Sequence, residues 1–388
     1  MMKTLFLSRT VIVLGLVSFL NDMSSEMITP LLPIFLTATL GAGPAIVGLV
    51  EGGAEATASL LKLFSGRMAD KGWNHKKLVV GGYSVSNLAR PLIGLAIGWG
   101  AVLLLRFLDR VGKGIRTSPR DALIAGSTDP ARLGMAFGFH RALDNGGAMV
   151  GPLLAWFLLR NSMDMGHVFL CSLVPGILVV LLLCFGLEAT PAFAELKKLP
   201  PLRWSAIDHR LRGLILAAGA LALASAPEAF MILWVNDQGL QIAWIPLIWA
   251  AASAVKTVVS GPAGILSDKF GRLPVLLSGW SLRICILFGL AWSCTVAHPG
   301  LVWPLFLAYA ASLATTEGAE RALIGDFANK KERATAFGLY HMVVGLAILP
   351  GAMLFGLVWQ IFGPAIAFTM NALLSISAVL LLTRQYKK

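Results

Sequence analysis

The strongest constraint on this chain is a succession of long apolar segments separated by polar, Gly or Pro breaks. About 20 mostly apolar residues cross a bilayer as one helix, and a helix satisfies its own backbone hydrogen bonds in lipid. The sequence therefore predicts an all-α integral membrane protein with twelve transmembrane helices. The predicted spans are 11–37, 46–66, 78–98, 100–125, 133–158, 166–187, 213–236, 242–263, 273–294, 301–325, 335–360 and 364–383.

The composition excludes an ordinary soluble domain. Of the 388 residues, 57% are hydrophobic and 13% are charged, whereas soluble domains have about 25% charged residues. The net charge of +12 would suggest nucleic-acid binding in a soluble protein. Here the basic residues lie between apolar segments, so we expect no nucleic-acid partner and interpret the charge as setting orientation in the membrane.

The basic residues of the connections predict the topology. They concentrate in alternate loops. Arg160 is the one Lys or Arg residue in the remaining loops, which lie near 38–45, 97–100, 159–165, 237–241, 295–300 and 361–363. Loops rich in Lys and Arg stay in the cytoplasm. We therefore expect a multi-pass protein of the inner (cytoplasmic) membrane, with both termini and the central loop in the cytoplasm.

The chain divides into two similar halves. A polar segment with three prolines, 188–212, is the predicted cytoplasmic linker between an N-terminal six-helix bundle (1–187) and a C-terminal six-helix bundle (213–388). A glycine–aspartate–lysine pattern at Gly66 recurs at Gly264, roughly 200 positions later, as internal repeats do. Repeats of this kind predict two pseudo-symmetric bundles with a substrate site between them near the midplane.

One segment, 106–121, has an unusual density of charge for a membrane span. Its charged residues recur every three or four positions and so share one helix face. An ionised group at the bilayer centre costs about 2.5–3.5 kcal/mol or more, so this face must meet protein or a water-filled cavity. The residues on the stripe are Arg106, Asp109, Arg110, Lys113, Arg116 and Arg120.

The repeated loop pattern resembles the signature of the major facilitator superfamily of secondary transporters, glycine–x3–aspartate–basic–x–glycine–basic. The second half matches it fully; in the first half, 73–75 displaces the usual glycine–arginine ending. The resemblance implies the twelve-helix fold of that family and a cytoplasmic latch, with Asp70 contacting the segment near 333–336. The latch candidates are Gly66, Asp70, Lys71, Arg120, Gly264, Asp268, Lys269, Gly271 and Arg272.

The resemblance implies two further motifs. Arg110 with Gly114 is similar to the family's arginine motif, which is linked to proton transfer. Gly147, Gly151 and Pro152 resemble the glycine–proline motif of its antiporters. Small residues permit close helix packing, and proline permits a bend. The chain thus resembles drug:proton antiporter-like bacterial members whose substrates are undefined.

The buried acids are the candidates for proton coupling. Asp22 and Glu26 lie four positions apart on one predicted helix, and so do Glu51 and Glu55. A carboxyl group whose charged partner changes between two states can bind and release a proton. Asp22 or Glu26 is the first choice among these proton sites, with Arg106, Arg110 or Lys113 as the counter-charge. Permanent ion pairs that only hold the first bundle together are the alternative.

A second set of polar residues within the spans gives the predicted substrate cavity. Arg141 and Asp144, three apart, are spaced to satisfy each other, and Lys256 occupies the repeat position of Glu55. The cavity candidates are Asn21, Arg90, Arg106, Asp109, Lys113, Arg141, Asp144, Asn145, Glu228, Lys256 and Glu317.

These features predict a monomeric secondary transporter that works by alternating access and exports a small organic compound or drug in exchange for protons. We expect no enzymatic activity, catalytic residue, cofactor or metal, because no phosphate-binding loop or metal-ligand spacing is present. Two alternatives remain open: proton-coupled uptake of a small anionic metabolite or chelate, favoured by the basic stripe, and a non-transporting membrane receptor or scaffold.

Overall fold

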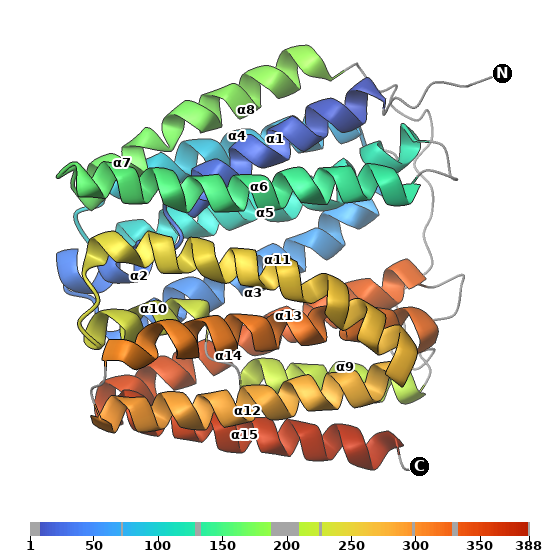
Figure 1. The fold of residues 1–388 in the computed structure, drawn as a ribbon. Coiled ribbons are helices and arrows are strands. Elements are labelled where there is room, and N and C mark those ends of the chain that lie inside the picture. Colours follow the sequence, from blue (N-terminus) through green and yellow to red (C-terminus); the bar gives the residue numbers. More distant parts are fainter. Residues whose placement is uncertain are drawn as a thin grey trace. The chain divides into compact units, whose positions relative to one another are not determined.

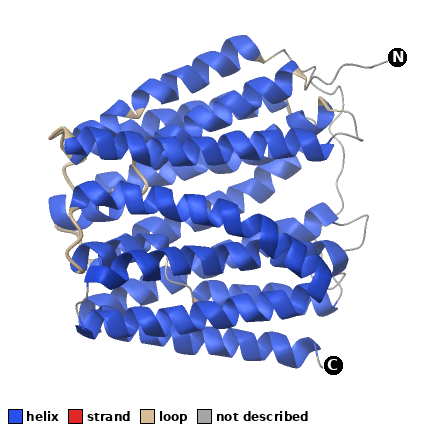
Figure 2. Cartoon of the chain, viewed as in Figure 1, coloured by secondary structure: helices blue, strands red, loops and turns tan. Residues whose placement is uncertain are grey.

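The computed structural model describes residues 8–70, 73–128, 133–187, 209–224, 227–296, 299–327 and 333–386. Helices make up almost all of this part of the chain, which contains no strand (Figure 2). The helices of the first half are α1 (Arg9–Glu26), α2 (Leu32–Ile34), η1 (Phe35–Thr39), α3 (Pro44–Asp70), α4 (His75–Leu92), η2 (Ile93–Leu95), α5 (Trp99–Gly126), α6 (Leu133–Arg160), α7 (Met165–Cys171) and α8 (Leu173–Gly186).

The second half continues in the same manner (Figure 1). Its helices are α9 (His209–Leu223), α10 (Glu228–Asp237), η5 (Ile242–Trp244), α11 (Ile245–Phe270), α12 (Arg272–Val296), η6 (Pro299–Leu301), α13 (Val302–Phe327), α14 (Arg333–Phe362) and α15 (Pro364–Tyr386). Each of the twelve predicted spans coincides with one helix or with consecutive short helices.

Proline and capping residues explain where helices are interrupted. The first predicted span is not one continuous helix: α1 ends at Glu26 and α2 begins at Leu32. Pro30 and Pro33 cause this difference, because proline lacks an N–H and crowds the preceding turn. At the start of α7, the Asp164 side chain accepts the His167 N–H at 3.0 Å, which caps the helix.

Within the described residues, seven helical segments are long and apolar enough to cross a membrane by length and composition alone. The predicted spans before residue 126 and the span 301–325 are not among them, although Val302–Thr316 is a shorter apolar helix. The seven are Phe139–Arg160, Met165–Gly186, His209–Asp237, Ile242–Ser260, Arg272–Val296, Leu339–Phe362 and Pro364–Arg384.

The contacts group the chain into two compact units. Unit 1 comprises the described residues within 1–29 and 60–200, and unit 2 those within 30–59 and 201–388. The first part of α3 thus packs with unit 2. A Cβ atom on Gly48 would lie 2.3 Å from the Ala352 carbonyl oxygen of α14, so only glycine permits this approach. The predicted division at 188–212 stays a prediction, since most of that linker lies outside the described residues.

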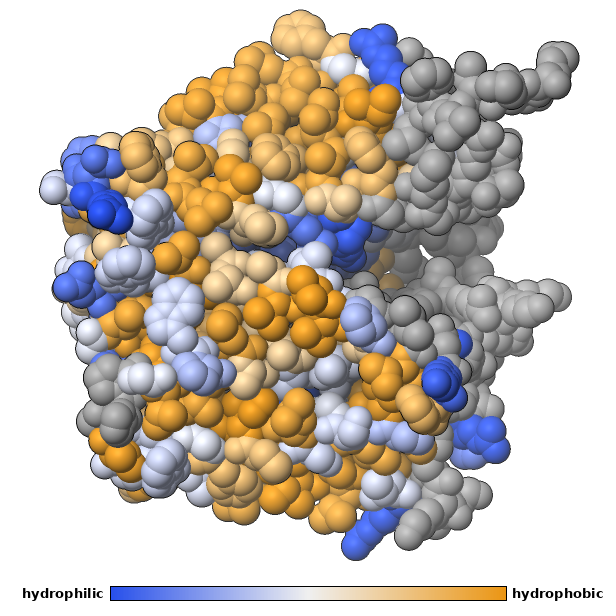
Figure 3. Space-filling view, viewed as in Figure 1, coloured by the Kyte–Doolittle hydropathy of each residue, from blue (hydrophilic) through white to orange (hydrophobic). Residues whose placement is uncertain are grey.

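Each unit has its own apolar core. In unit 1, α1, α4 and α8 bury Leu14, Tyr83 and Leu183 together. In unit 2, the core around α9, α12 and α15 includes Trp280 and Leu382. Large apolar residues are also exposed, and Figure 3 shows a mostly hydrophobic visible face. A surface of this kind is suited to lipid contact.

Candidate functional site

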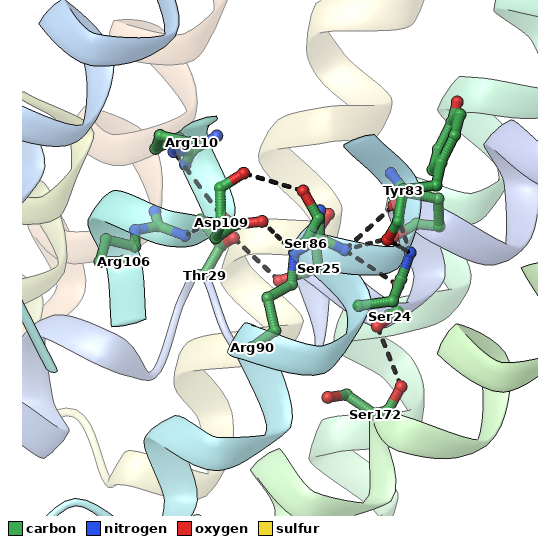
Figure 4. Close-up of polar contacts among 12 residues, drawn as sticks. Ser24, Ser25, Thr29, Tyr83, Ser86, Arg90, Arg106, Asp109, Arg110 and Ser172 are labelled. Atoms are coloured by element: carbon green, nitrogen blue, oxygen red, sulfur yellow. Dashed lines mark hydrogen bonds and ion pairs between the residues drawn. The ribbon is translucent and has the colours of Figure 1, made fainter. Parts of the chain in front are cut away.

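The centre of unit 1 is a buried carboxylate surrounded by arginines. Asp109 on α5 is 1% exposed, and Arg90 of α4 donates from Nε to its Oδ1 at 2.7 Å. Arg106 Nη1 lies 3.5 Å from Oδ2, and Arg110 Nε lies 3.8 Å from the same oxygen (Figure 4). Since a buried charge is tolerated only with opposite partners and hydrogen bonds, these residues depend on one another.

Small residues bring α4 and α5 close enough for this cluster to form. A Cβ atom on Gly82 would lie 2.6 Å from the Gly112 carbonyl oxygen. Beside this contact, the Ser86 hydroxyl donates to the Asp109 carbonyl oxygen at 2.8 Å and accepts from Arg116 Nη1 at 2.6 Å. The Arg116 guanidinium also lies 4.2 Å from the Tyr83 ring centroid, a favourable cation–π distance.

The same cluster ties α1 to α4. Arg90 Nη1 donates to the Asn21 carbonyl oxygen at 3.2 Å and to its side-chain oxygen at 3.1 Å. One turn further along α1, the Ser24 hydroxyl donates to the Ser172 carbonyl oxygen at 3.0 Å (Figure 4). Asn21 therefore joins, through Arg90, the carboxylate of Asp109 on the charged stripe.

A second polar cluster lies between α1 and α6. The carboxyl groups of Asp22 and Asp144 are within hydrogen-bonding reach of each other. The Ser18 hydroxyl donates to Asp144, and Arg141 pairs with Asp144 at 3.2 Å, the partner that its spacing predicts. The Asn21 amide donates to Asp22 Oδ1 at 2.9 Å. The sequence spacing places Asp22 and Glu26 on one helix face. The contact between Asp22 and Asp144, an acid from another helix, follows only from the fold.

The glycine–proline segment of α6 forms the contact that brings these carboxyls together. A Cβ atom on Gly147 would lie 2.1 Å from the Phe19 carbonyl oxygen, and one on Gly151 would lie 2.5 Å from that of Met23. Any larger residue would therefore push α1 away from α6. Pro152 and Asn145 lie in the same helix, and Asn145 is partly buried.

The other acids among the proton candidates are divided between the units. Glu26 belongs to unit 1, as does the cavity candidate Lys113, and each contributes to the electrostatic surroundings of Asp22. Glu51 and Glu55 lie on the part of α3 that belongs to unit 2, and both have polar or electrostatic partners.

Four of the nine latch candidates lie outside the described side chains. This is true of Asp70, Lys71, Gly264 and Asp268, and also of the cavity candidate Glu317. Among the described latch residues, Arg120 pairs with Asp121 at 2.9 Å, and Gly271 has φ +94, a value that favours glycine, directly before Arg272. Gly66 lies beside Ser118, and Lys269 lies over the Phe270 ring. The latch remains a prediction.

In unit 2, the predicted residues Glu228 and Lys256 form an ion pair between α10 and α11. Both line a hollow together with Trp249, Phe306 and Tyr309. Behind it, the buried Arg283 hydrogen-bonds Tyr309. The sequence pattern does not single out Phe306 or Tyr309, because they look like ordinary apolar residues until α11 and α13 are packed together.

The described part of the chain contains no group of three or more His, Cys, Asp or Glu side chains placed to hold a metal ion. Its polar clusters consist instead of ion pairs and hydrogen bonds between helices of a chain with many apolar spans. Such clusters inside a helical membrane protein are typical of substrate and ion pathways. The fold and these sites define a multi-pass membrane transporter.

Comparison with known proteins identifies the family. The model of the Major Facilitator Superfamily matches residues 14–319, and the chain belongs to this superfamily. It is 34% identical over 383 residues to the uncharacterized MFS-type transporter MJ1317 of Methanocaldococcus jannaschii, with 97% of this chain and 94% of that protein covered. It is 23% identical to the multidrug resistance protein MdtH of Photorhabdus laumondii, with 83% and 79% covered.

Solved structures share the fold. The nucleoside transporter NupG superposes with a TM-score of 0.81 at 12% identity, covering 97% of this chain and 100% of that one. A bacterial homologue of the human lysosomal transporter Spinster gives 0.74 at 18% identity, covering 99% and 96%. The chain therefore has the twelve-helix fold of two six-helix bundles. Its membership of a superfamily of transporters makes it a transporter and not an enzyme.

Proposed function

We propose that this protein exports a small organic compound in exchange for protons by alternating access. Its position would be the inner membrane with both termini in the cytoplasm, and it would act as a monomer. The observation on which the proposal rests is the contact between the Asp22 and Asp144 carboxyls across α1 and α6.

Two carboxyl groups in contact cannot both be ionised without strong repulsion, so they favour a shared proton. Basic groups also surround the pair: Lys113 near Asp22, and Arg120 and Arg141 near Asp144. A small movement of α1 against α6 would separate the carboxyls and leave each with a basic partner. This change would release the proton, which is the step that a proton-coupled transporter needs.

Two other observations support exchange rather than uptake. The α1–α6 contact is made by the segment that resembles the antiporters' glycine–proline motif, and its glycines leave no space for a side chain. A distant relative is named a multidrug resistance protein. Together they favour outward movement of an organic compound.

The test uses the full-length protein in proteoliposomes with an imposed proton gradient and a trapped pH-sensitive dye. A library of metabolites and drugs is screened for compounds that move protons across the membrane. We expect the compound to move in the direction opposite to the protons. This flux should be lost in Asp22→Asn and kept in Asp164→Asn, because Asp164 lies outside the α1–α6 contact. Flux without a gradient effect, or protons moving with the compound, would contradict the proposal.

A second candidate is proton-coupled uptake of a small anion, favoured by Arg110. Its Nε is buried and has no hydrogen-bond partner among the described residues, although it lies 3.8 Å from Asp109. A carboxylate or phosphate group would satisfy such a guanidinium. Arg110→Lys keeps the charge but not the planar donors, so a selective loss of anion uptake in this variant would favour the second candidate.

A further inference from the structure

His140 on α6 is a buried, titratable side chain to which the proposed function gives no role. It is 5% exposed, and its Nε2 atom is buried and has no hydrogen-bond partner among the described residues. Most buried polar atoms in native proteins are hydrogen-bonded, because burial without a partner costs stability. A buried ring nitrogen that is left unpaired therefore points to a function.

The position of His140 relates it to the carboxyl pair of Asp22 and Asp144. His140 and Asp144 are four positions apart on α6, so they are neighbours on one helix face. α6 begins at Leu133, which places His140 about 10 Å along the helix from that end and Asp144 about 6 Å further. The distribution of basic loops predicts that this end is cytoplasmic. His140 thus lies between the carboxyl pair and the predicted cytoplasmic side.

The charged groups that face the His140 ring come from two helices. Arg120 and Asp121 belong to α5, Arg141 and Asp144 belong to α6, and all four contribute to its electrostatic surroundings. Two positive and two negative groups add little net charge, whereas burial favours the neutral ring. One nitrogen of a neutral imidazole is unprotonated and can accept a proton. The surroundings therefore keep the ring in the form that accepts.

We propose that His140 carries the proton between the Asp22–Asp144 pair and the cytoplasm. The inference rests on the proposed proton-coupled export and names a proton-transfer residue for it. When the two carboxyls separate, the O–H bond of the pair breaks and an N–H bond forms on the ring. The imidazolium then gives this proton to water towards the start of α6. The ring returns to its neutral form, and no other reactant is consumed.

The unpaired Nε2 atom is consistent with this cycle. A nitrogen that binds and releases a proton in turn would be hindered by a permanent hydrogen bond, because each transfer would have to break it. A histidine that only packs between helices would gain stability from a permanent partner. The missing partner thus favours transfer over packing.

The experiment measures proton transfer without a substrate, since the transported compound is unidentified. The full-length protein in lipid is moved rapidly from H2O to D2O. Infrared spectroscopy then follows the C=O band of a protonated carboxyl that is absent in Asp22→Asn and in Asp144→Asn. The rate at which this band shifts is the rate at which the pair exchanges its proton with water. We expect exchange at least about tenfold slower in His140→Gln, because an amide forms hydrogen bonds but does not carry a proton.

Two further variants separate proton transfer from packing. In His140→Ala, we expect slow exchange that added imidazole restores, whereas an equal concentration of a larger buffer does not. The matched control is His341→Gln on α14, because the His341 ring is exposed and packs against the Tyr340 ring. We expect it to exchange at the wild-type rate.

Size-exclusion chromatography and the melting temperature establish that each variant is folded. Wild-type exchange in folded His140→Gln would overturn the proposal, and so would slow exchange in folded His140→Ala that imidazole does not restore. Each of these variants decides the question if the other does not fold.

The outcomes distinguish this inference from the proposed function. Unchanged exchange in His140→Gln contradicts the inference alone and leaves proton-coupled export by another route intact. Imidazole-restored exchange in a protein without gradient-driven flux contradicts the proposed function and leaves His140 as the transfer residue. Absence of a carboxyl band that depends on Asp22 and Asp144 contradicts both.

Discussion

Arg90 on α4 donates from Nε to Oδ1 of Asp109 on α5 at 2.7 Å, and both side chains are almost fully buried. From the same guanidinium, Nη1 donates to Asn21 on α1. One ion pair thus connects three helices of unit 1. Because the pair is buried and hydrogen-bonded to a third helix, we interpret it as a structural joint of this unit.

Removing the carboxylate of this joint should strongly destabilise the protein. Asp109→Asn leaves the adjacent arginines without their common negative charge, and breaking a buried pair costs about 3–5 kcal/mol. We expect a clearly lower melting temperature in detergent. Asp121→Asn is the control, since Asp121 is 45% exposed in its pair with Arg120 and such pairs contribute about 0–1 kcal/mol. Equal decreases in melting temperature for Asp109→Asn and Asp121→Asn would contradict the role of Asp109 as a structural joint.

The α1–α6 contact should not tolerate a side chain at its closest point. Gly147→Val would place atoms against the Phe19 carbonyl oxygen, where even a Cβ would lie at 2.1 Å. We expect loss of the monodisperse peak in size-exclusion chromatography. Gly81→Ala on α4 is the matched control, because nothing lies within 4 Å of its Cβ position. A well-folded Gly147→Val protein would exclude this contact.

Substitution of Asp22 or Asp144, the two acids at the α1–α6 contact, should reduce proton coupling more than substitution of other acids. Asp144→Asn keeps a hydrogen-bonding group beside Asp22 but cannot share a titrating proton with it. We expect at least about tenfold less gradient-driven flux, with the melting temperature little changed. Asp237→Asn, in unit 2, should retain the flux. Normal coupling in Asp144→Asn would mean that Asp22 acts without it.

The cap of α7 gives a prediction for pH. Hydrogen bonds from His167 hold the pKa of Asp164 below its ordinary value of 3.8. A lowered pKa means that the cap stabilises the protein above that ordinary value and loses this effect as the pH falls through the lowered value. We therefore expect Asp164→Ala to lower the melting temperature at neutral pH, and the difference from wild type to shrink in strong acid. Hydrogen exchange at 165–168 is the local measurement; a difference independent of pH would contradict this role.

The outline of the fold follows from local properties of the chain. Apolar length predicts each span, and the prolines at 30 and 33 mark where the first one breaks. The spacing of Arg141 and Asp144 predicts their ion pair, because residues three apart always share a helix face. These features depend only on neighbours along one helix.

The partners of the site depend on which helices meet. Asp109 is one charge among several on its stripe, and the sequence does not say that Arg90, from another span, is the residue that reaches it. The same applies to Asp22 with Asp144, and to the aromatic residues around Glu228 and Lys256.

The sequence alone thus determines a twelve-span membrane transporter with charges at membrane depth, because the hydrophobic effect and backbone hydrogen bonding act on every segment separately. Which charges pair is determined by close helix contacts at glycines such as Gly82 and Gly147. Those contacts set the rotation and distance of each helix, and these quantities arise only when the helices pack together.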